Sequence, residues 1–292
     1  MKNLINYYYN LIITEFRKID NYFNFIIDST KYVFMPFEGD INSFYKLYLT
    51  LNQNNKYCHE IIINKDNSII TFYENKPYIL LKKNIYLTNR VTLGEILNYD
   101  TLVYENYEFN WKELWKNKID YYEYQINQLG FKYRILRESF SYYVGLSETA
   151  INILNYVDNG SIKSYICHKR INYKEEMDDF LNPVNIIVDN RTRDISEYFK
   201  INYINESISM DEVLNFLENI NFDYNESLLF MSRLLYPSYY FDMYDKIIQE
   251  KVSEEKINFY IKKNVYYETF LKQIYRYLKF KYKIPEIEWL EI

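Results

Sequence analysis

The chain has 292 residues, with 35 Lys and Arg against 40 Asp and Glu, and a net charge of −5 at pH 7. This length suffices for two lobes of ordinary size, and the acid excess excludes a general attraction to nucleic acid or to an anionic membrane. No run approaches the ~18 apolar residues of a membrane span. Residues 1–6 are broken by Asn and make no signal-peptide core, so we expect a protein made and kept in the cytosol.

Cysteine and histidine are scarce, which restricts metal and nucleophile chemistry. Cys58 and Cys167 lie far apart in the sequence and are expected to be buried free thiols. His59 and His168 are the only histidines, which excludes a multi-His metal centre. Tyr is abundant, at 36 residues. Codon bias is a sufficient explanation for this, although a Tyr-rich surface would also be adhesive.

The first 83 residues are predicted to form a strand-rich lobe with one inserted helix. Asp40 is a suitable cap for that helix, which carries Phe44, Leu47, Tyr48 and Leu51 on one face. The turns at 65–67 and 74–76 resemble hairpin loops. Runs rich in apolar and aromatic residues predict strands at residues 7–13, 23–27, 31–37, 60–64, 68–73 and 77–82.

Beyond Lys83 the apolar period changes from two to 3.6, which predicts a helical lobe over residues 84–292. Short strands are expected at 165–168 and 184–188. Helices are expected at residues 92–98, 111–129 and 134–157, and from residues 194, 209, 225, 241 and 253, the last reaching towards Lys283. The pattern as a whole predicts an α+β protein with two lobes.

The segment from Cys167 to Tyr198 carries a family resemblance. It contains Cys-His-Lys-Arg at 167–170 and the run Asn-Pro-Val-Asn-Ile-Ile-Val-Asp-Asn-Arg-Thr-Arg-Asp-Ile-Ser-Glu-Tyr at 182–198. This resembles the core of the aminoglycoside-phosphotransferase-like kinases, and most of all the spore-coat-associated kinase-like proteins of Firmicutes. Further similar stretches are Leu-Gly-Glu-Ile at 93–96, the Trp-rich residues 111–120, and Arg-Leu-Leu-Tyr-Pro-Ser-Tyr-Tyr-Phe-Asp at 233–242. The resemblance implies a bilobal protein-kinase-like fold of the aminoglycoside phosphotransferase type.

Against that family the catalytic loop departs from the expected pattern. Residues 167–170 stand where the family has His-Gly-Asp, so Arg170 replaces the catalytic carboxylate. A guanidinium cannot accept a proton from a substrate hydroxyl. Glu175 falls where the metal-binding Asn of the loop is expected, and His168 is expected to be a hydrogen-bonded structural histidine.

The block that follows can be placed in two ways. In the first, residues 189–194 match the family's Asp-His-Pro-x-x-Asp stretch, and Asn185 stands where the magnesium-holding Asp belongs. In the second, residues 182–189 are a decayed His-Pro-Gly-Asn-Ile-Leu loop and Asn185 is a true metal-loop Asn. The first is preferred because residues 193–198 continue an Arg-Asp-Leu-Ala-Glu pattern. This implies structural roles for Arg193, Asp194 and Glu197, with Asp194 tying down backbone near the catalytic loop.

The N-lobe lacks the parts that hold phosphates in such enzymes. The sequence contains no glycine before Gly39 that could form a phosphate-binding loop. The region of the phosphate-binding Lys is occupied by Met35 or Phe37. The helix at 41–53 contains no Glu that could pair with such a Lys. Single parts of this machinery are often worth ~10³ or more in rate. We therefore expect a pseudokinase without catalytic residues, metal or cofactor, and the sequence indicates no cofactor-binding residues.

The leading hypothesis is a non-catalytic scaffold that binds coat or sporulation proteins, in the mother cell or spore coat if the organism sporulates. The first alternative is a small-molecule phosphotransferase that uses ATP and Mg, with Asp179, Asn185 or Asp189 on the metal. The second is a nucleotide or ligand sensor without turnover. The cations Lys169, Arg170, Arg191, Arg193 and Lys200 could form an anion patch, but salt bridges to Asp178, Asp179, Asp189 and Asp194 are the simpler expectation. The acidic run at 175–179 is expected to be a solvated face.

Overall fold

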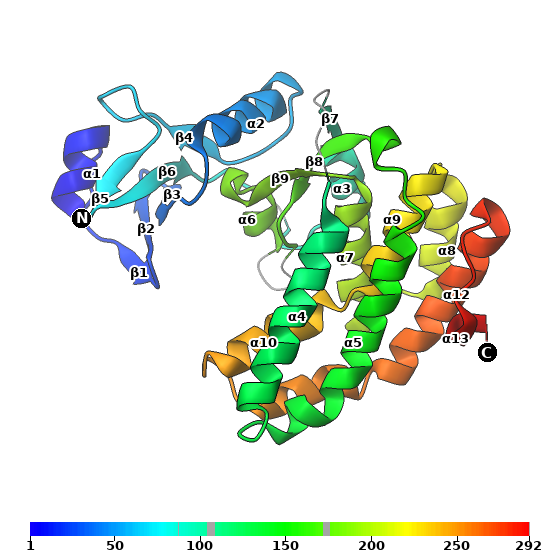
Figure 1. Cartoon of the computed structure of the whole chain (residues 1–292). Helices are drawn as coiled ribbons and strands as arrows, with labels where there is room; N and C mark the ends of the chain where they lie inside the picture. Colours follow the sequence, from blue (N-terminus) through cyan, green and yellow to red (C-terminus); the bar gives the residue numbers. More distant parts are fainter. Residues whose placement is uncertain (87, 104–108, 172–175, 292) are drawn as a thin grey trace. The chain divides into compact units, whose positions relative to one another are not determined.

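The computed structural model describes residues 1–86, 88–103, 109–171 and 176–291 (Figure 1). The chain forms two compact units. One, here called the first unit, comprises Met1–Thr101 and His168–Ile187, and the second unit comprises Leu102–Cys167 and Val188–Ile292. The chain passes between the units within β7 (Thr101–Val103), β8 (Ser164–His168) and β9 (Ile186–Asp189), which form a sheet in the order β7-β8-β9. The lobe boundary between residues 83 and 84 stays a prediction.

The first unit is built on a six-stranded sheet in the order β1-β2-β3-β6-β4, with β5 also paired to β6. The pairs among these strands are antiparallel. The helix after Asp40 is confirmed, since the Asp40 carboxylate accepts a hydrogen bond from the Ser43 amide at 2.7 Å. The elements are α1 (Lys2–Tyr9), β1 (Arg17–Ile19), β2 (Tyr22–Ile27), β3 (Thr30–Pro36), α2 (Ile41–Gln53), β4 (Glu60–Ile62), β5 (Thr71–Tyr73), β6 (Lys76–Lys82), α3 (Leu93–Tyr99), α6 (Glu176–Phe180) and the 3₁₀ turn η2 (Pro183–Asn185).

The strand predicted at residues 7–13 is wrong, because residues 7–9 belong to helix α1 (Lys2–Tyr9). Ile5 and Tyr9 are four residues apart, so one helix face presents both to the sheet, where they join a buried cluster with Phe23 and Phe34. Asn10 adopts a left-handed conformation (φ 53°) and ends the helix. The aromatic run therefore packs onto the sheet as a helix, without adding a strand to it.

The two predicted hairpin turns have different outcomes. Glu74 and Asn75 both have positive φ and connect β5 to its neighbour β6, as predicted. The turn at 65–67 joins β4 to β5, and both of these strands pair with β6. The hairpin predicted there is wrong because the buried Asn64 side chain organises the loop, accepting hydrogen bonds from the amides of Asp66 and Ser68 and donating to the Ile70 carbonyl.

The second unit packs around α9 (Tyr224–Leu235), whose residues from Glu226 onward are all buried. A helix that is apolar on most sides needs neighbours on every side, and α9 contacts α5, α7 and α12. The remaining elements are α4 (Trp111–Leu129), α5 (Arg134–Leu154), η1 (Asn159–Ser161), α7 (Thr192–Ile204), α8 (Met210–Asn219), α10 (Ser238–Ile248), η3 (Glu254–Ile257), α11 (Asn258–Ile261), α12 (Asn264–Tyr282) and α13 (Glu288–Glu291).

The last predicted helix is corrected by the structure. The segment after Ser253 is divided into η3, α11 and α12, and Ile257 and Tyr267, one on each side of the break, are both buried. Lys283, with φ 57°, ends α12. Within the part of the chain that the structure describes, none of the helices combines the length and apolarity that a membrane span requires.

Candidate functional site

His168 is held inside the first unit by aromatic neighbours. The residue is 1% exposed, and its ring stacks on that of Phe180 with 4.2 Å between the ring centroids. The centroid of the Tyr99 ring lies 4.9 Å away. The Nε2 atom lies 3.0 Å from the Phe180 carbonyl oxygen. Because a carbonyl only accepts, Nε2 carries the proton. This environment fits the structural histidine expected from the sequence.

Asn185 links the backbone at Arg170 to the backbone at Asp179. Its Nδ2 donates to the carbonyl oxygens of Arg170, at 2.9 Å, and of Asp179, at 3.2 Å. Its own carbonyl accepts from the Lys169 amide at 2.7 Å. The side-chain nitrogen of Asn185 is thus occupied by hydrogen bonds to the backbone at Arg170 and Asp179. The side chain of Arg170 is half-buried. Glu175, expected near this loop, lies outside the described residues.

Residues 177–182 pack against the strands and loops that come from the N-terminal part of the chain. Phe180 and Leu181 are buried, and the His59 amide donates to the Leu181 carbonyl at 2.8 Å. The Asn182 side-chain nitrogen lies 3.6 Å from the sulfur of Met35 on β3. Met35, at one of the two positions predicted to replace the phosphate-binding Lys, is therefore covered by the chain itself.

An ion-pair network anchors this packed segment. Asp178 on α6 accepts from His59 Nε2 at 3.1 Å and from Lys83 Nζ at 2.5 Å. The Asn84 amide donates to His59 Nδ1 at 3.2 Å, so Nδ1 must be unprotonated and Nε2 must carry the hydrogen that Asp178 accepts. Burial raises the pKa of Asp178, but the hydrogen bonds from His59 and Lys83 outweigh it and lower the pKa to about 2.

The sequence predicts only part of this network. A salt bridge to Asp178 is expected alongside a solvated acidic run, but His59 and Lys83 are not among the partners expected for it. Here the side chain of Asp178 is only 28% exposed and lies against a histidine 119 positions earlier in the chain. A single acidic residue in a charge run gives no local signal of such a distant partner.

Asp178 should give the protein an acid-dependent component of stability. Its pKa is lowered in the folded state from 3.8 to about 2, so the stabilisation is present above pH ~4 and is lost as the pH falls towards 2. We expect Asp178→Asn to cost about 2 kcal/mol at pH 7 and to cost progressively less below pH 4. Urea unfolding of both proteins at pH 7, 4 and 2.5 measures this difference.

Glu60→Gln is the matched control, because Glu60 forms an exposed ion pair with Lys82, with 53% and 41% of the side chains exposed. Such a pair is worth at most about 1 kcal/mol. A cost of Asp178→Asn that stays constant from pH 7 to pH 2.5 would contradict the assignment.

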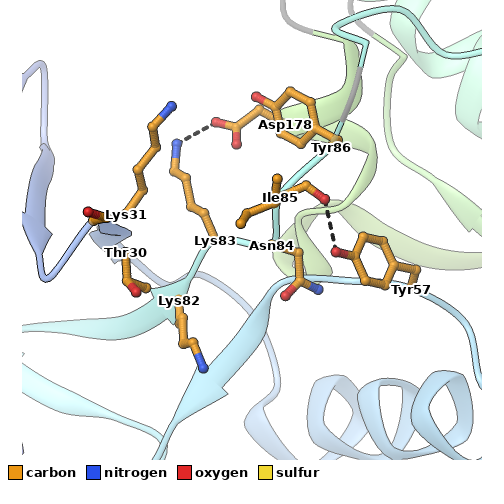
Figure 2. Close-up of a pocket in the computed structure, with 10 residues that line it drawn as sticks. Thr30, Lys31, Tyr57, Lys82, Lys83, Asn84, Ile85, Tyr86 and Asp178 are labelled. Carbon is orange, nitrogen blue, oxygen red and sulfur yellow. Dashed lines mark hydrogen bonds and ion pairs between the residues drawn. The ribbon is translucent and has the colours of Figure 1, made fainter.

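A pocket of about 470 Å³ adjoins the network (Figure 2). Its lining comes from the start of β3, the end of β6, the segment that follows β6, and α6. The hydroxyl of Tyr57 donates to the Ile85 carbonyl at 2.9 Å and so holds one wall. The lining residues are Ser29, Thr30, Lys31, Tyr57, Lys82, Lys83, Asn84, Ile85, Tyr86 and Asp178.

Asp189 lies in a buried cluster within the second unit. Its Oδ1 accepts from the Asn190 amide at 2.7 Å and from Arg233 Nη2 at 2.5 Å. Its Oδ2 accepts from Arg193 Nη1 at 2.9 Å and from Trp111 Nε1 at 3.2 Å. These four donors match the roughly four acceptor positions of a carboxylate. The ion pair from Arg193 to Asp189 is one of those expected from the sequence.

Glu197 and Lys200 form a second buried pair on α7. Lys200 is 1% exposed, and its Nζ donates to Glu197 Oε1 at 2.9 Å, to the Tyr236 carbonyl at 3.0 Å and to Ser238 Oγ at 3.1 Å. Arg191 instead pairs with Glu226 at 2.7 Å. The expected salt bridges of Lys200 and Arg191 are thus present, but with acids that the sequence reasoning had not paired with them.

Cys167 and Asp194 lie close to the Asp189 cluster. Both Cys58 and Cys167 are buried free thiols, as predicted. Burial, and after it the carboxylates of Asp194 and Asp189, raise the pKa of the Cys167 thiol. The negative charge of Asp194 therefore acts on the thiol of Cys167, the residue before His168 near the end of β8. The tie from Asp194 to the loop backbone stays a prediction.

Candidate metal ligands are dispersed in this structure. Among the residues that it describes, no three His, Cys, Asp or Glu side chains are grouped so that they could hold a metal ion. Asn185 belongs to the first unit and Asp189 to the second. The metal roles predicted for them in an active enzyme stay predictions.

Comparison with known proteins identifies the family. The family model described as "Spore coat putative kinase YutH" matches residues 2–274. The chain belongs to this family. A curated relative, the endospore coat-associated protein YutH of Bacillus subtilis (strain 168), is 25% identical over 280 residues, covering 82% of this chain and 81% of the relative. The resemblance inferred from residues 167–198 is confirmed.

Solved structures confirm the fold class of the YutH family member. An aminoglycoside phosphotransferase from Alicyclobacillus acidocaldarius has a TM-score of 0.67, 9% identity, and 96% coverage of both chains. Spectinomycin phosphotransferase in complex with AMP has a TM-score of 0.57 and 13% identity, with 88% of this chain and 92% of that chain covered. At these identities the likeness concerns the α+β, kinase-like fold alone.

Proposed function

We propose that the chain is a kinase-like protein that does not transfer phosphoryl groups and instead binds other proteins of the spore coat. The observation that carries the proposal is the packing of residues 177–182 within the first unit. Met35 is 5% exposed and lies under Asn182, and Phe37 is 4% exposed, so both strand positions considered for the phosphate-binding Lys carry covered, uncharged side chains. Phosphoryl transfer depends on charge neutralisation at that position.

Two further observations support loss of catalysis. Arg170 stands in place of the proton-accepting carboxylate. Asp189 already accepts hydrogen bonds from the guanidinium groups of the buried Arg233 and the partly buried Arg193, from an indole and from an amide. A metal at Asp189 would have to displace the guanidinium groups of Arg193 and Arg233, so a rearranged phosphotransferase would have to rely on Asp179 and Asn185.

The coat assignment rests on the family and on the Bacillus subtilis relative, which is endospore coat-associated. We propose that the chain is made in the cytoplasm of the mother cell and becomes part of the coat through protein partners. A fluorescent fusion expressed in sporulating Bacillus subtilis tests this. Enrichment at the spore periphery is expected, and diffuse fluorescence throughout the mother cell would contradict the coat role.

Thermal unfolding with ATP, with and without Mg²⁺, tests the loss of catalysis. A ligand present at a hundred times its Kd would add about 2.7 kcal/mol to stability, which corresponds to roughly 5–10 °C in Tm for a chain of this size. We expect a change in Tm below about 1 °C in either condition. An active aminoglycoside phosphotransferase, measured in parallel, provides the positive control.

The two alternatives give distinct results in the same experiment. Stabilisation that requires Mg²⁺ would favour a phosphotransferase, and release of labelled phosphate from ATP would then establish it. Stabilisation by ATP without Mg²⁺ would favour a sensor. Either result would sink the non-nucleotide-binding scaffold.

A further inference from the structure

Two lysines lie opposite each other at the pocket in Figure 2. Tyr32 on β3 pairs with Lys82 on β6, and the Lys83 amide donates to the Lys31 carbonyl at 2.8 Å, which extends the ladder by one position. Directly opposed residues of an antiparallel pair have Cβ atoms about 4.5–5.5 Å apart, and like charges there are destabilising. Lys31 and Lys83 extend to the same side, towards Asp178, whereas Lys82 points away.

The charges at this pocket do not balance. Among the described residues that line the pocket, Asp178 is the one carboxylate, and it is already bound to Lys83. Lys82, on the opposite side, has its own partner in Glu60. Among the residues that the structure describes, Lys31 forms no ion pair. Two opposed cations therefore share one anion, and one positive charge is left for a ligand to neutralise.

The walls of the pocket indicate what should accompany that negative charge. Ile85 is 87% exposed and Tyr57 55% exposed, so an apolar side chain and an aromatic ring border the lysines. The volume of about 470 Å³ falls in the range typical of small-molecule sites. An apolar body resting on Ile85 and Tyr57 would remove their surface from water.

The lining favours a carboxylate over a phosphate. Among the described residues that line the pocket, there is neither glycine nor arginine, whereas phosphate sites commonly use glycine-rich backbone amides or the guanidinium fork. A single surplus charge is matched by a carboxylate, while a phosphomonoester carries about −1.5 to −2 at pH 7. The additional negative charge of a phosphomonoester would lie beside the Asp178 carboxylate and be repelled by it.

We propose that this pocket binds a monocarboxylate with an apolar body, with the carboxylate bridging Lys31 and Lys83 and the apolar part on Ile85 and Tyr57. The carboxylate could belong to a free organic acid or to a Glu side chain of a protein partner, since both offer the same chemistry to the lysines. The proposal does not depend on whether the chain transfers phosphate.

Methyl NMR of the full chain with hexanoate as the probe tests the proposal. The Ile85 methyl signal, assigned through Ile85→Val, should shift saturably with hexanoate and not with the neutral isostere hexanamide. Lys31→Gln should weaken binding about tenfold. Lys82→Gln is the matched control: Lys82 also lines the pocket, but its side chain points away from Lys31 and Lys83 and its Nζ is paired with Glu60, so this change should alter the Kd by less than about twofold. Asp178→Asn should tighten binding, because it releases Lys83.

Several results would overturn the proposal. Equal shifts with hexanamide would mean that apolar contact alone is sensed, and equal losses in Lys31→Gln and Lys82→Gln would mean general surface charge. Tighter, Lys31-dependent binding of ATP would replace the carboxylate with a phosphate ligand. N-acetyl-Glu-Leu-amide separates the two sources: tighter binding than hexanoate supports a protein Glu side chain, and weaker binding supports a free acid.

Discussion

Asp189→Ala should lower the free energy of unfolding by about 3–5 kcal/mol, because it leaves buried cations without their carboxylate. Arg233 is 6% exposed. The Nη1 atom of Arg193 lies 2.9 Å from Asp189 Oδ2, the same oxygen that accepts from the Trp111 indole. Burial lowers the pKa of Arg233, and the charge of Asp189 opposes this shift. Urea unfolding monitored by tryptophan fluorescence measures the loss, since Trp111 reports directly on the cluster.

A triple variant shows whether the cost comes from unpaired charge. In Asp189→Leu with Arg193→Met and Arg233→Met, the whole cluster becomes apolar, and we expect most of the stability lost in Asp189→Ala to return. A loss below about 1 kcal/mol in Asp189→Ala would mean that its carboxylate is not a structural ion-pair partner. The metal role considered for Asp189 in an active enzyme would then regain weight.

The architecture could largely be predicted because its elements carry local signals. The helix at 111–129 has apolar residues at helical spacing and is followed by Gly130, and the structure has the same bounds for α4. The strand at 31–37 and the cap at Asp40 are of the same kind. The helix α1 was misjudged because its aromatic residues have high strand propensity, and contact with the sheet decides the outcome.

The surroundings of the candidate site could be predicted only in part. The replacement of the catalytic carboxylate by Arg170 is a prediction that rests on the residue type at a family position. Arg193 could be expected as a partner of Asp189, because it lies four residues further along the chain. The contacts of His59 with Asp178 and of Arg233 with Asp189 could not, since these residues are remote in sequence and neither pair has a characteristic spacing. The segment at 177–182 likewise reads as an ordinary acidic loop until its contacts with Met35 and His59 are seen.

The second buried pair tests the structural role assigned to Glu197. Lys200→Met should cost about 3 kcal/mol, because the Glu197 carboxylate, with a side chain 12% exposed, would lose its cation and the Tyr236 carbonyl would lose a donor. The isosteric Met fills the volume of the lysine stem, so the loss measures polar contacts and not a cavity. Unfolding by urea at pH 7 gives the value, with Lys82→Met in the exposed pair with Glu60 as the control, expected below about 1 kcal/mol.

A double-mutant cycle with Glu197→Gln separates the charge interaction from the hydrogen bonds. Ser238 Oγ lies 3.0 Å from Glu197 Oε1 and 3.1 Å from Lys200 Nζ, so Gln can keep the hydroxyl contact while giving up the charge. We expect a coupling energy of at least about 1 kcal/mol between the two substitutions, since contacting residues in one network are not additive. Additive losses would mean that Lys200 is held mainly by the Tyr236 carbonyl. In that case Glu197 would not be the residue that fixes α7 to the segment before α10.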